Sequence, residues 1–133
     1  MLICADLNDF FAETLINLNC RPDTRAYLIN IYTQNRFTHN DLSQHNLSIL
    51  FCQAKFNNDF YLHQQIGDWI FFVKTIIPAH FGNSNDYYEN IGRLSYYSCY
   101  KLINRKWPLF EELSDCFPSL ENQARELLRS LHI

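Results

Sequence analysis

Glycine and proline are scarce in this 133-residue chain, with three and four copies. A turn-rich all-β protein needs both at its many tight turns, so their scarcity argues against that class. Charged residues make up only 19% of the chain, and no run of lysine or arginine occurs. Because the net charge is −3 as well, the sequence predicts neither a nucleic-acid-binding surface nor a basic membrane-binding patch.

The sequence also has no segment typical of export or membrane insertion. The N-terminal residues lack a basic cluster, and Asp6 and Asp9 interrupt their apolar character, which is not the pattern of a signal peptide. The apolar run Trp69–Val73 ends at Lys74, far short of the ~18 residues that a membrane span needs. The five cysteines form no Cys-x-x-Cys pair, which argues against a disulfide framework or a zinc site. We therefore expect reduced thiols and a cytoplasmic protein without a membrane span.

Hydrophobic residues recur at intervals of three and four positions through most of the chain, which indicates amphipathic α-helices. The expected helices begin near Leu7, Pro22, Asn40, Phe60, Asp86, Pro108 and Glu121, with a break at residues 117–119 and a last helix ending near Leu131. The segment 60–77 is apolar around nearly its whole circumference, so we place it at the centre. The sequence thus predicts an all-α fold, a compact single-domain bundle of six or seven helices over residues 1–133.

Two of the three glycines, Gly67 and Gly92, fall inside predicted helices. Glycine costs about 1 kcal/mol relative to alanine at such a position. That cost is typical of places where another helix approaches closely, because the missing side chain leaves room for contact. We therefore predict that the helices around residues 60–77 and 86–103 pack closely at Gly67 and Gly92.

Asp68 lies on the same apolar helix and needs a partner if it is buried, because an unpaired buried carboxylate is costly or stays protonated. Arg93 is the expected partner, and the hydroxyl groups of Tyr87, Tyr88 and Tyr96 are the alternatives. The favoured interpretation is a polar lock, a buried polar contact that orients two helices. The other interpretation is a pocket in which the carboxylate polarises a ligand or donates a proton.

The segments 67–78 and 87–97 together carry a distinctive pattern. The first has Gly-Asp, then aliphatic and aromatic residues, and then proline. The second has Tyr-Tyr, a glycine four residues after the second tyrosine, and a tyrosine four residues after that glycine. The residues that form the pattern are Gly67, Asp68, Phe72, Pro78, Tyr87, Tyr88, Gly92 and Tyr96. The pattern resembles a signature of a family of uncharacterised bacterial all-helical proteins. The chain departs from it at Lys74-Thr75, where Ser-Gly is usual, and at Ser95, where alanine is usual. The resemblance implies a shared helical core and no activity.

Sequence patterns for metal, nucleophile or phosphate-loop chemistry are absent. His63 and His80 could form a metal site only together with a distant carboxylate. Cys20 and Cys116 lie near predicted helix ends, the better places for a reactive thiol, but neither belongs to a motif. We predict no catalytic residue, metal or cofactor. The alternative is a bundle that binds a small apolar ligand or a metal, or an enzyme that uses Asp68.

Aromatic residues make up 16% of the chain, and tyrosines are concentrated in the segment 87–100. At helical spacing these side chains cannot all face the core, and tyrosine is enriched at protein contacts. We expect Tyr88, Tyr97 and Tyr100 to form an interaction surface; filling of a small core or lining of an apolar cavity are the alternatives. The sequence therefore predicts a non-catalytic interaction or regulatory domain that contacts a protein partner or a second copy of itself.

Overall fold

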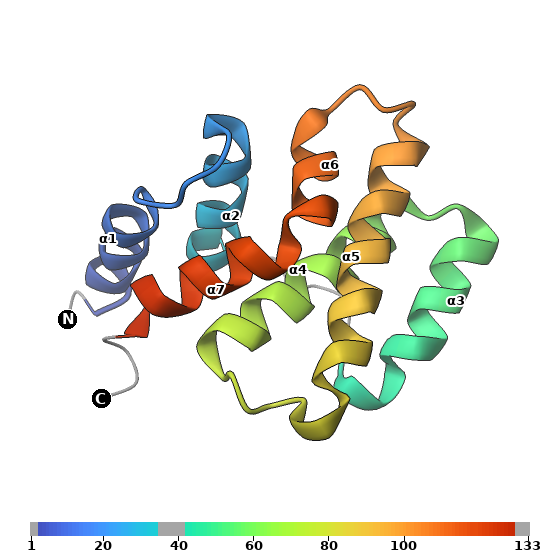
Figure 1. The fold of residues 1–133 in the computed structure, drawn as a ribbon, viewed down its shortest axis with the longest axis horizontal. Helices are drawn as coiled ribbons and strands as arrows, with labels where there is room; N and C mark the ends of the chain where they lie inside the picture. The colour runs from blue at the N-terminus through green and yellow to red at the C-terminus, as the bar shows by residue number, and fades with distance from the viewer. Residues whose placement is uncertain (1–2, 35–41, 130–133) are drawn as a thin grey trace.

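The computed structural model describes residues 3–34 and 42–129, and within these ranges the regular structure is entirely helical. The elements, labelled in Figure 1, are α1 (Ile3–Leu15), α2 (Pro22–Gln34), the 3-10 turn η1 (Gln44–Asn46), α3 (Leu47–Asn57), α4 (Phe60–Ile76), the 3-10 turn η2 (Gly82–Ser84), α5 (Asn85–Leu102), α6 (Pro108–Asp115) and α7 (Phe117–Leu127). Seven α-helices and no strand in the described residues confirm the predicted compact all-α class. None of these helices is long and apolar enough to cross a membrane.

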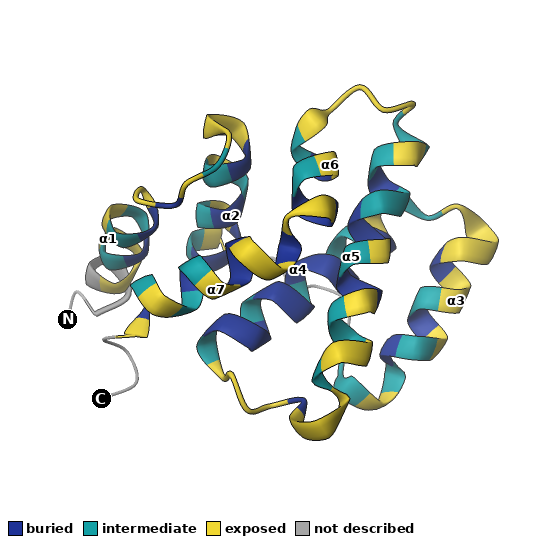
Figure 2. Cartoon of the chain, in the orientation of Figure 1, coloured by how far each residue is buried: buried dark blue, intermediate teal, exposed yellow. Residues whose placement is uncertain are grey.

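Helix α4 lies at the centre of the fold, as its apolar circumference predicts. It packs against α2, α3, α5 and α7, and most of its residues are buried (Figure 2). The helix begins where the Asp59 side chain accepts a hydrogen bond from the backbone N–H of Leu62 at 3.1 Å, which satisfies one of the free donors of the first turn. It ends at Ile76, two residues before Pro78, because proline cannot continue a helix.

The other helices are arranged on both sides of α4. Helices α1 and α2 pack on each other at one edge of the molecule, and α3 forms the opposite edge (Figure 1). Helix α5 runs back along α4 after the turn η2, where Gly82 adopts a positive φ of 53°. Helix α3 therefore has one face on α4 and α5 and another face toward solvent.

One predicted helix boundary is wrong, and two others lie outside the described residues. The break predicted at residues 117–119 does not occur, because Pro118 lies in the first turn of α7, where the missing N–H needs no partner. Cys116 ends α6 and begins α7, so the chain turns a corner without a loop. Helix α3 begins at Leu47, after η1; its expected start at Asn40 or Asp41 lies outside the described residues, as does the expected end at Leu131.

Gly67 marks a close approach of α5 to α4. A methyl group added at Gly67 would lie 2.8 Å from the ring of Tyr96, which is fully buried. The contact is between glycine and an aromatic ring of α5, and not the direct glycine-to-glycine contact that close packing at both positions suggested. Glycine is required here because the Tyr96 ring occupies the space of a β-carbon.

Gly92 of α5 allows a similar close approach by side chains of α7 and α4. A β-carbon there would lie 3.0 Å from the ring of Phe117 on α7 and 3.3 Å from the Ile70 side chain on α4. Gly67 faces Tyr96 and Gly92 faces Ile70, so the two glycines lie about one turn apart along the antiparallel pair. Each glycine admits one large side chain into the contact between helices.

We predict that Gly67→Ala lowers the free energy of unfolding by up to about 2 kcal/mol. Overpacking of a buried ring costs about 1–3 kcal/mol, and the better helix propensity of alanine offsets about 1 kcal/mol of that cost. Urea denaturation followed by circular dichroism measures the difference. A variant more stable than the parent protein by about 1 kcal/mol, the gain expected from helix propensity alone, would contradict the close contact with Tyr96.

Candidate functional site

Asp68 is the centre of a buried polar contact that joins three helices. The residue is 8% exposed, and its Oδ1 atom accepts hydrogen bonds from the hydroxyl groups of Tyr27 and Tyr96, each at 2.7 Å. Tyr27 lies on α2 and Tyr96 lies on α5, whereas Asp68 lies on α4. The carboxylate therefore holds α2 and α5 against the central helix, which is the geometry of a polar lock.

The surroundings of Asp68 keep its partners protonated. Burial, and then the charge of Asp68, raises the pKa of Tyr27 and of Tyr96 well above the usual value for tyrosine. Burial and the same charge also raise the pKa of the Cys99 thiol. Both phenols therefore remain hydrogen-bond donors, and Cys99 remains a thiol that is a poor nucleophile.

The expected partner Arg93 makes a different contact, and this prediction is corrected. Its Nε atom donates to the backbone carbonyl oxygen of Ser114 on α6 at 3.1 Å. Two of the alternative tyrosines also lie elsewhere, since the Tyr87 hydroxyl group is 2.7 Å from Ser48 Oγ and Tyr88 donates to the Gln44 carbonyl oxygen at 3.2 Å. Of the four residues considered, Tyr96 is the one described as a donor to Asp68.

A second buried polar cluster lies at the C-terminal end of α4, around Lys74. This side chain is 2% exposed, and its ammonium group lies 3.2 Å from Glu121 Oε1 on α7 and 3.5 Å from Glu89 Oε1 on α5. It also donates to Asn85 Oδ1 at 2.8 Å. Burial raises the pKa of the Glu121 carboxyl group, and the positive charges of Lys74 and Arg125 oppose that rise. The cluster ties α4 to both α5 and α7.

Thr75 forms a third buried contact next to the cluster. Its hydroxyl group shares one hydrogen bond between the backbone oxygen atoms of Phe71 and Phe72. It is also hydrogen-bonded to the hydroxyl group of Tyr32 on α2. Lys74 and Thr75 are the two positions where the sequence departs from Ser-Gly in the signature described above. At these positions larger polar side chains extend from the helix to partners on α2, α5 and α7.

Sequence patterns did not indicate that Tyr27, Glu121 and Glu89 contact the polar side chains of α4. The spacing of Glu121 and Arg125, four residues apart, was the available signal that one face of α7 is charged, and these two side chains do form an ion pair. Nothing in local spacing pairs Glu121 with Lys74, because the two residues meet only through tertiary packing.

The histidines named as metal-site candidates lie apart. His63 is in the first turns of α4 and its ring contacts Phe51, whereas His80 follows the end of α4 and its ring contacts Trp69. In the described parts of the chain no three histidine, cysteine, aspartate or glutamate side chains come together as a metal site would require.

His63 is almost fully buried, and its pKa is correspondingly low. The side chain is 1% exposed, and desolvation lowers its pKa to about 4, with Asp59 opposing and Lys55 adding to that effect. Lys101 of α5 lines the same cavity and adds a further positive charge nearby. His63 is therefore neutral in the folded protein at neutral pH.

We predict that His63 makes the free energy of unfolding fall as the pH is lowered from 6.5 to about 4. In this range the unfolded chain binds a proton at His63 and the folded protein does not, so stability rises with pH. Urea denaturation at several pH values measures the slope. His63→Gln reduces the slope of the free energy of unfolding against pH by up to the contribution of one bound proton. His80→Gln, at an exposed histidine, serves as the control. An unchanged slope in His63→Gln contradicts the burial of a neutral imidazole.

The tyrosines predicted to form an interaction surface are only partly exposed. Tyr88 stacks on Phe81 at 4.7 Å between ring centroids, and Tyr100 packs against the core. Tyr97 lies beneath the Lys101 ammonium group, 5.1 Å from the ring centroid. All three side chains are half-buried, so they are not the most accessible aromatic groups of the protein.

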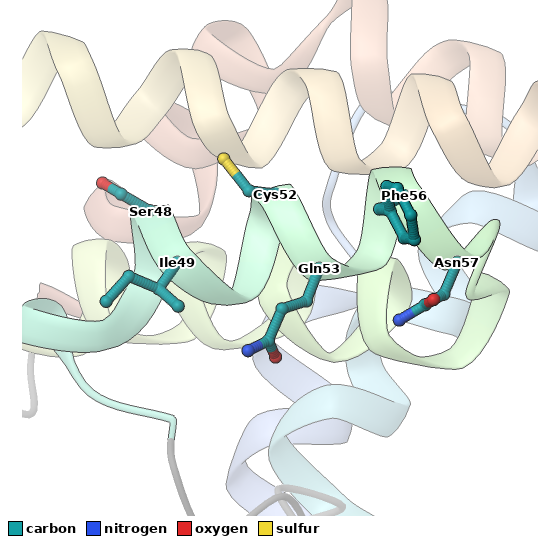
Figure 3. A pocket seen from close by; sticks show the side chains of 6 residues that line it. All are labelled: Ser48, Ile49, Cys52, Gln53, Phe56 and Asn57. Carbon is teal, nitrogen blue, oxygen red and sulfur yellow. The ribbon is translucent and has the colours of Figure 1, made fainter.

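The most accessible apolar surface lies on the outer side of α3. Phe56 is 89% exposed and Ile49 is 59% exposed, and Cys52 lies between them on the same face. These residues flank a shallow hollow of about 510 Å³, completed by Ser48, Gln53 and Asn57 (Figure 3). We call this set the α3 face. It contains no charged residue, and all its members come from one helix.

No protein-family model, curated protein or solved structure matches this chain.

Proposed function

We propose that this protein is a non-catalytic helical interaction domain that associates with a second copy of itself through the α3 face. The observation that carries the proposal is the exposure of Ile49 and Phe56 on an uncharged helix face at the edge of the fold. Exposed apolar side chains that are contiguous on one face are typical of protein contact sites.

The shape of the α3 face favours a protein partner over a small apolar ligand. Small-ligand sites enclose most of the ligand and are lined from several sides. The hollow over Cys52 is shallow, and its six lining residues all belong to α3. Such a surface buries little of a small molecule, but a second helix can cover it along its whole length.

The residue order of the α3 face favours a second copy of the chain. In a two-fold antiparallel pairing of α3 with itself, the small Cys52 lies near the crossing point and Phe56 of each copy lies over Ile49 of the other. The large and the medium-sized side chains are thus complementary under the commonest symmetry of protein dimers. The absence of charge on the face means that two identical surfaces do not repel each other.

The length of α3 limits the strength of this contact. An 11-residue helix is about 16 Å long, and one such pair buries less than the ~1,000 Å² of a stable interface. We therefore expect a concentration-dependent dimer with a dissociation constant in the micromolar range, on the order of 10–100 µM. Association of this kind suits a regulatory role better than a permanent assembly.

The proposal includes a cytoplasmic location and a relationship to the family of uncharacterised bacterial helical proteins. Cys20, Cys52, Cys99 and Cys116 are free thiols, and two of them are exposed, which supports a reducing compartment such as the cytoplasm. The contacts of Gly67, Asp68 and Tyr96 give the resemblance to the uncharacterised bacterial family a structural basis in close packing. The Asp68 contact supports a structural role, because its partners Tyr27 and Tyr96 are core side chains of two other helices.

We predict that Ile49→Glu abolishes self-association while Ile16→Glu does not. Both isoleucines are similarly exposed, at 59% and 55%, but Ile16 follows α1 and lies away from α3. Sedimentation equilibrium from about 5 to 200 µM measures the monomer–dimer equilibrium. The parent protein and Ile16→Glu dimerise with rising concentration, and Ile49→Glu stays monomeric.

Thiol crosslinking tests the geometry of the dimer. A short bismaleimide joins two copies through Cys52, so Cys52→Ser removes the crosslinked product and Cys116→Ser, at another exposed cysteine, retains it. A parent protein that is monomeric at about 200 µM contradicts the proposal, and so does a dimer that Ile49→Glu leaves intact.

A further inference from the structure

A second cavity lies where three helices come together at one end of the bundle. It has a volume of about 300 Å³ and lies where α3 ends, α4 begins and α5 ends. Polar and apolar atoms contribute to its lining in similar shares, and the lining residues are Lys55, Asn58, His63, Ser98, Lys101 and Leu102. None of these residues belongs to the α3 face. The volume is at the lower end of the range for small-molecule sites.

Two ammonium groups border this cavity without an ion-pair partner in the described part of the chain. Lys55 lies 5.9 Å from the ring centroid of Phe51, and Lys101 lies 5.1 Å from that of Tyr97. Lys74, in the last turn of α4, has two carboxylates within 3.5 Å. Two positively charged side chains thus line the cavity, and its lining contains no carboxylate.

His63, one of the lining residues, carries an unsatisfied polar atom. Its Nδ1 atom is buried and has no hydrogen-bond partner among the described residues, although the residue is 1% exposed. A buried polar atom in this state costs about 1–3 kcal/mol unless something completes its hydrogen bonding. Asp59 is the nearest negative charge, but its side chain already accepts from the Leu62 N–H.

We propose that this cavity binds a small oxyanion, a phosphate group that is either free or part of a small metabolite. The two ammonium groups match the charge of a phosphate dianion, and lysine binds phosphate as a point charge. The imidazole of His63 and the side-chain amide of Asn58 offer hydrogen bonds in addition. The volume of about 300 Å³ leaves room for a short carbon skeleton beside the phosphate.

Nuclear magnetic resonance of the full chain tests this site with inorganic phosphate and glycerol phosphate as separate probes. Saturable binding shifts the ¹⁵N resonance of His63 Nδ1, because the anion approaches that atom and favours the protonated ring. The His63 pKa then rises from about 4 when phosphate is present. Tighter binding of glycerol phosphate assigns the site to a phosphorylated metabolite, and tighter binding of inorganic phosphate assigns it to the free ion.

Charge-removing variants separate a built site from general attraction of anions. Lys55→Gln and Lys101→Gln each weaken phosphate binding about tenfold or more, since each removes one of two charges. Arg129→Gln removes the same charge from an exposed position on the chain after α7 and leaves binding unchanged. Urea denaturation confirms that the variants are folded.

Three results would overturn the proposal. The first is a linear, non-saturating response to both probes up to about 50 mM, the level of non-specific ion binding. The second is an equal loss of binding in Arg129→Gln. The third is saturable binding that leaves the His63 resonances unmoved, because it would place the anion at another surface.

Discussion

The fold depends on polar side chains that the central helix buries. Helix α4 is surrounded by α2, α3, α5 and α7, yet it carries Asp68, Lys74 and Thr75 into the core. A charge in such a place is strongly destabilising unless it is paired and hydrogen-bonded. Each of the three residues meets a partner from another helix, and the direction of each partner restricts how that helix can lie.

These contacts constrain the arrangement of the bundle more tightly than apolar packing alone. Apolar side chains tolerate shifts of a helix along its neighbour, because one contact replaces another of similar energy. The Asp68 carboxylate accepts from phenols on α2 and α5 at one level, and Lys74 binds carboxylates of α5 and α7 at another. A shift of α5 by one turn would break both sets. We infer that these polar contacts select one register among similar apolar packings.

On the outer surface the notable feature is the exposed apolar face of α3. In the tyrosine-rich segment Tyr88, Tyr97 and Tyr100 are half-buried, whereas the exposed side chains of Ile49 and Phe56 lie on one face of α3, at the edge of the fold. The core contacts give α3 a rigid support on α4 and α5, and its outer face is available for a partner. The cavity with Lys55 and His63 lies beside that support, on a different side of α3.

Periodicity and composition predicted the all-α class, the central position of residues 60–77 and the close packing at Gly67, because these properties depend on local sequence. Tyr96 was named among the possible partners of Asp68, but Tyr27 was not, and Arg93 was preferred wrongly. The choice of partner depends on how three helices meet in space, which spacing along one helix does not encode. The exposure of Phe56 was missed for the same reason, since one apolar stripe of α3 faces the core and another does not.

The most direct test of this account is a double-mutant cycle on Asp68 and Tyr96, with the free energy of unfolding as the readout. Asp68→Ala leaves the buried hydroxyl group of Tyr96 without its acceptor, and Tyr96→Phe removes one of the two tyrosine hydrogen bonds to Asp68, so each variant is destabilised. The account predicts that the double variant is more stable than the sum of the single losses by about 1–2 kcal/mol. Additivity within about 0.5 kcal/mol would contradict a central role for the Asp68 contact.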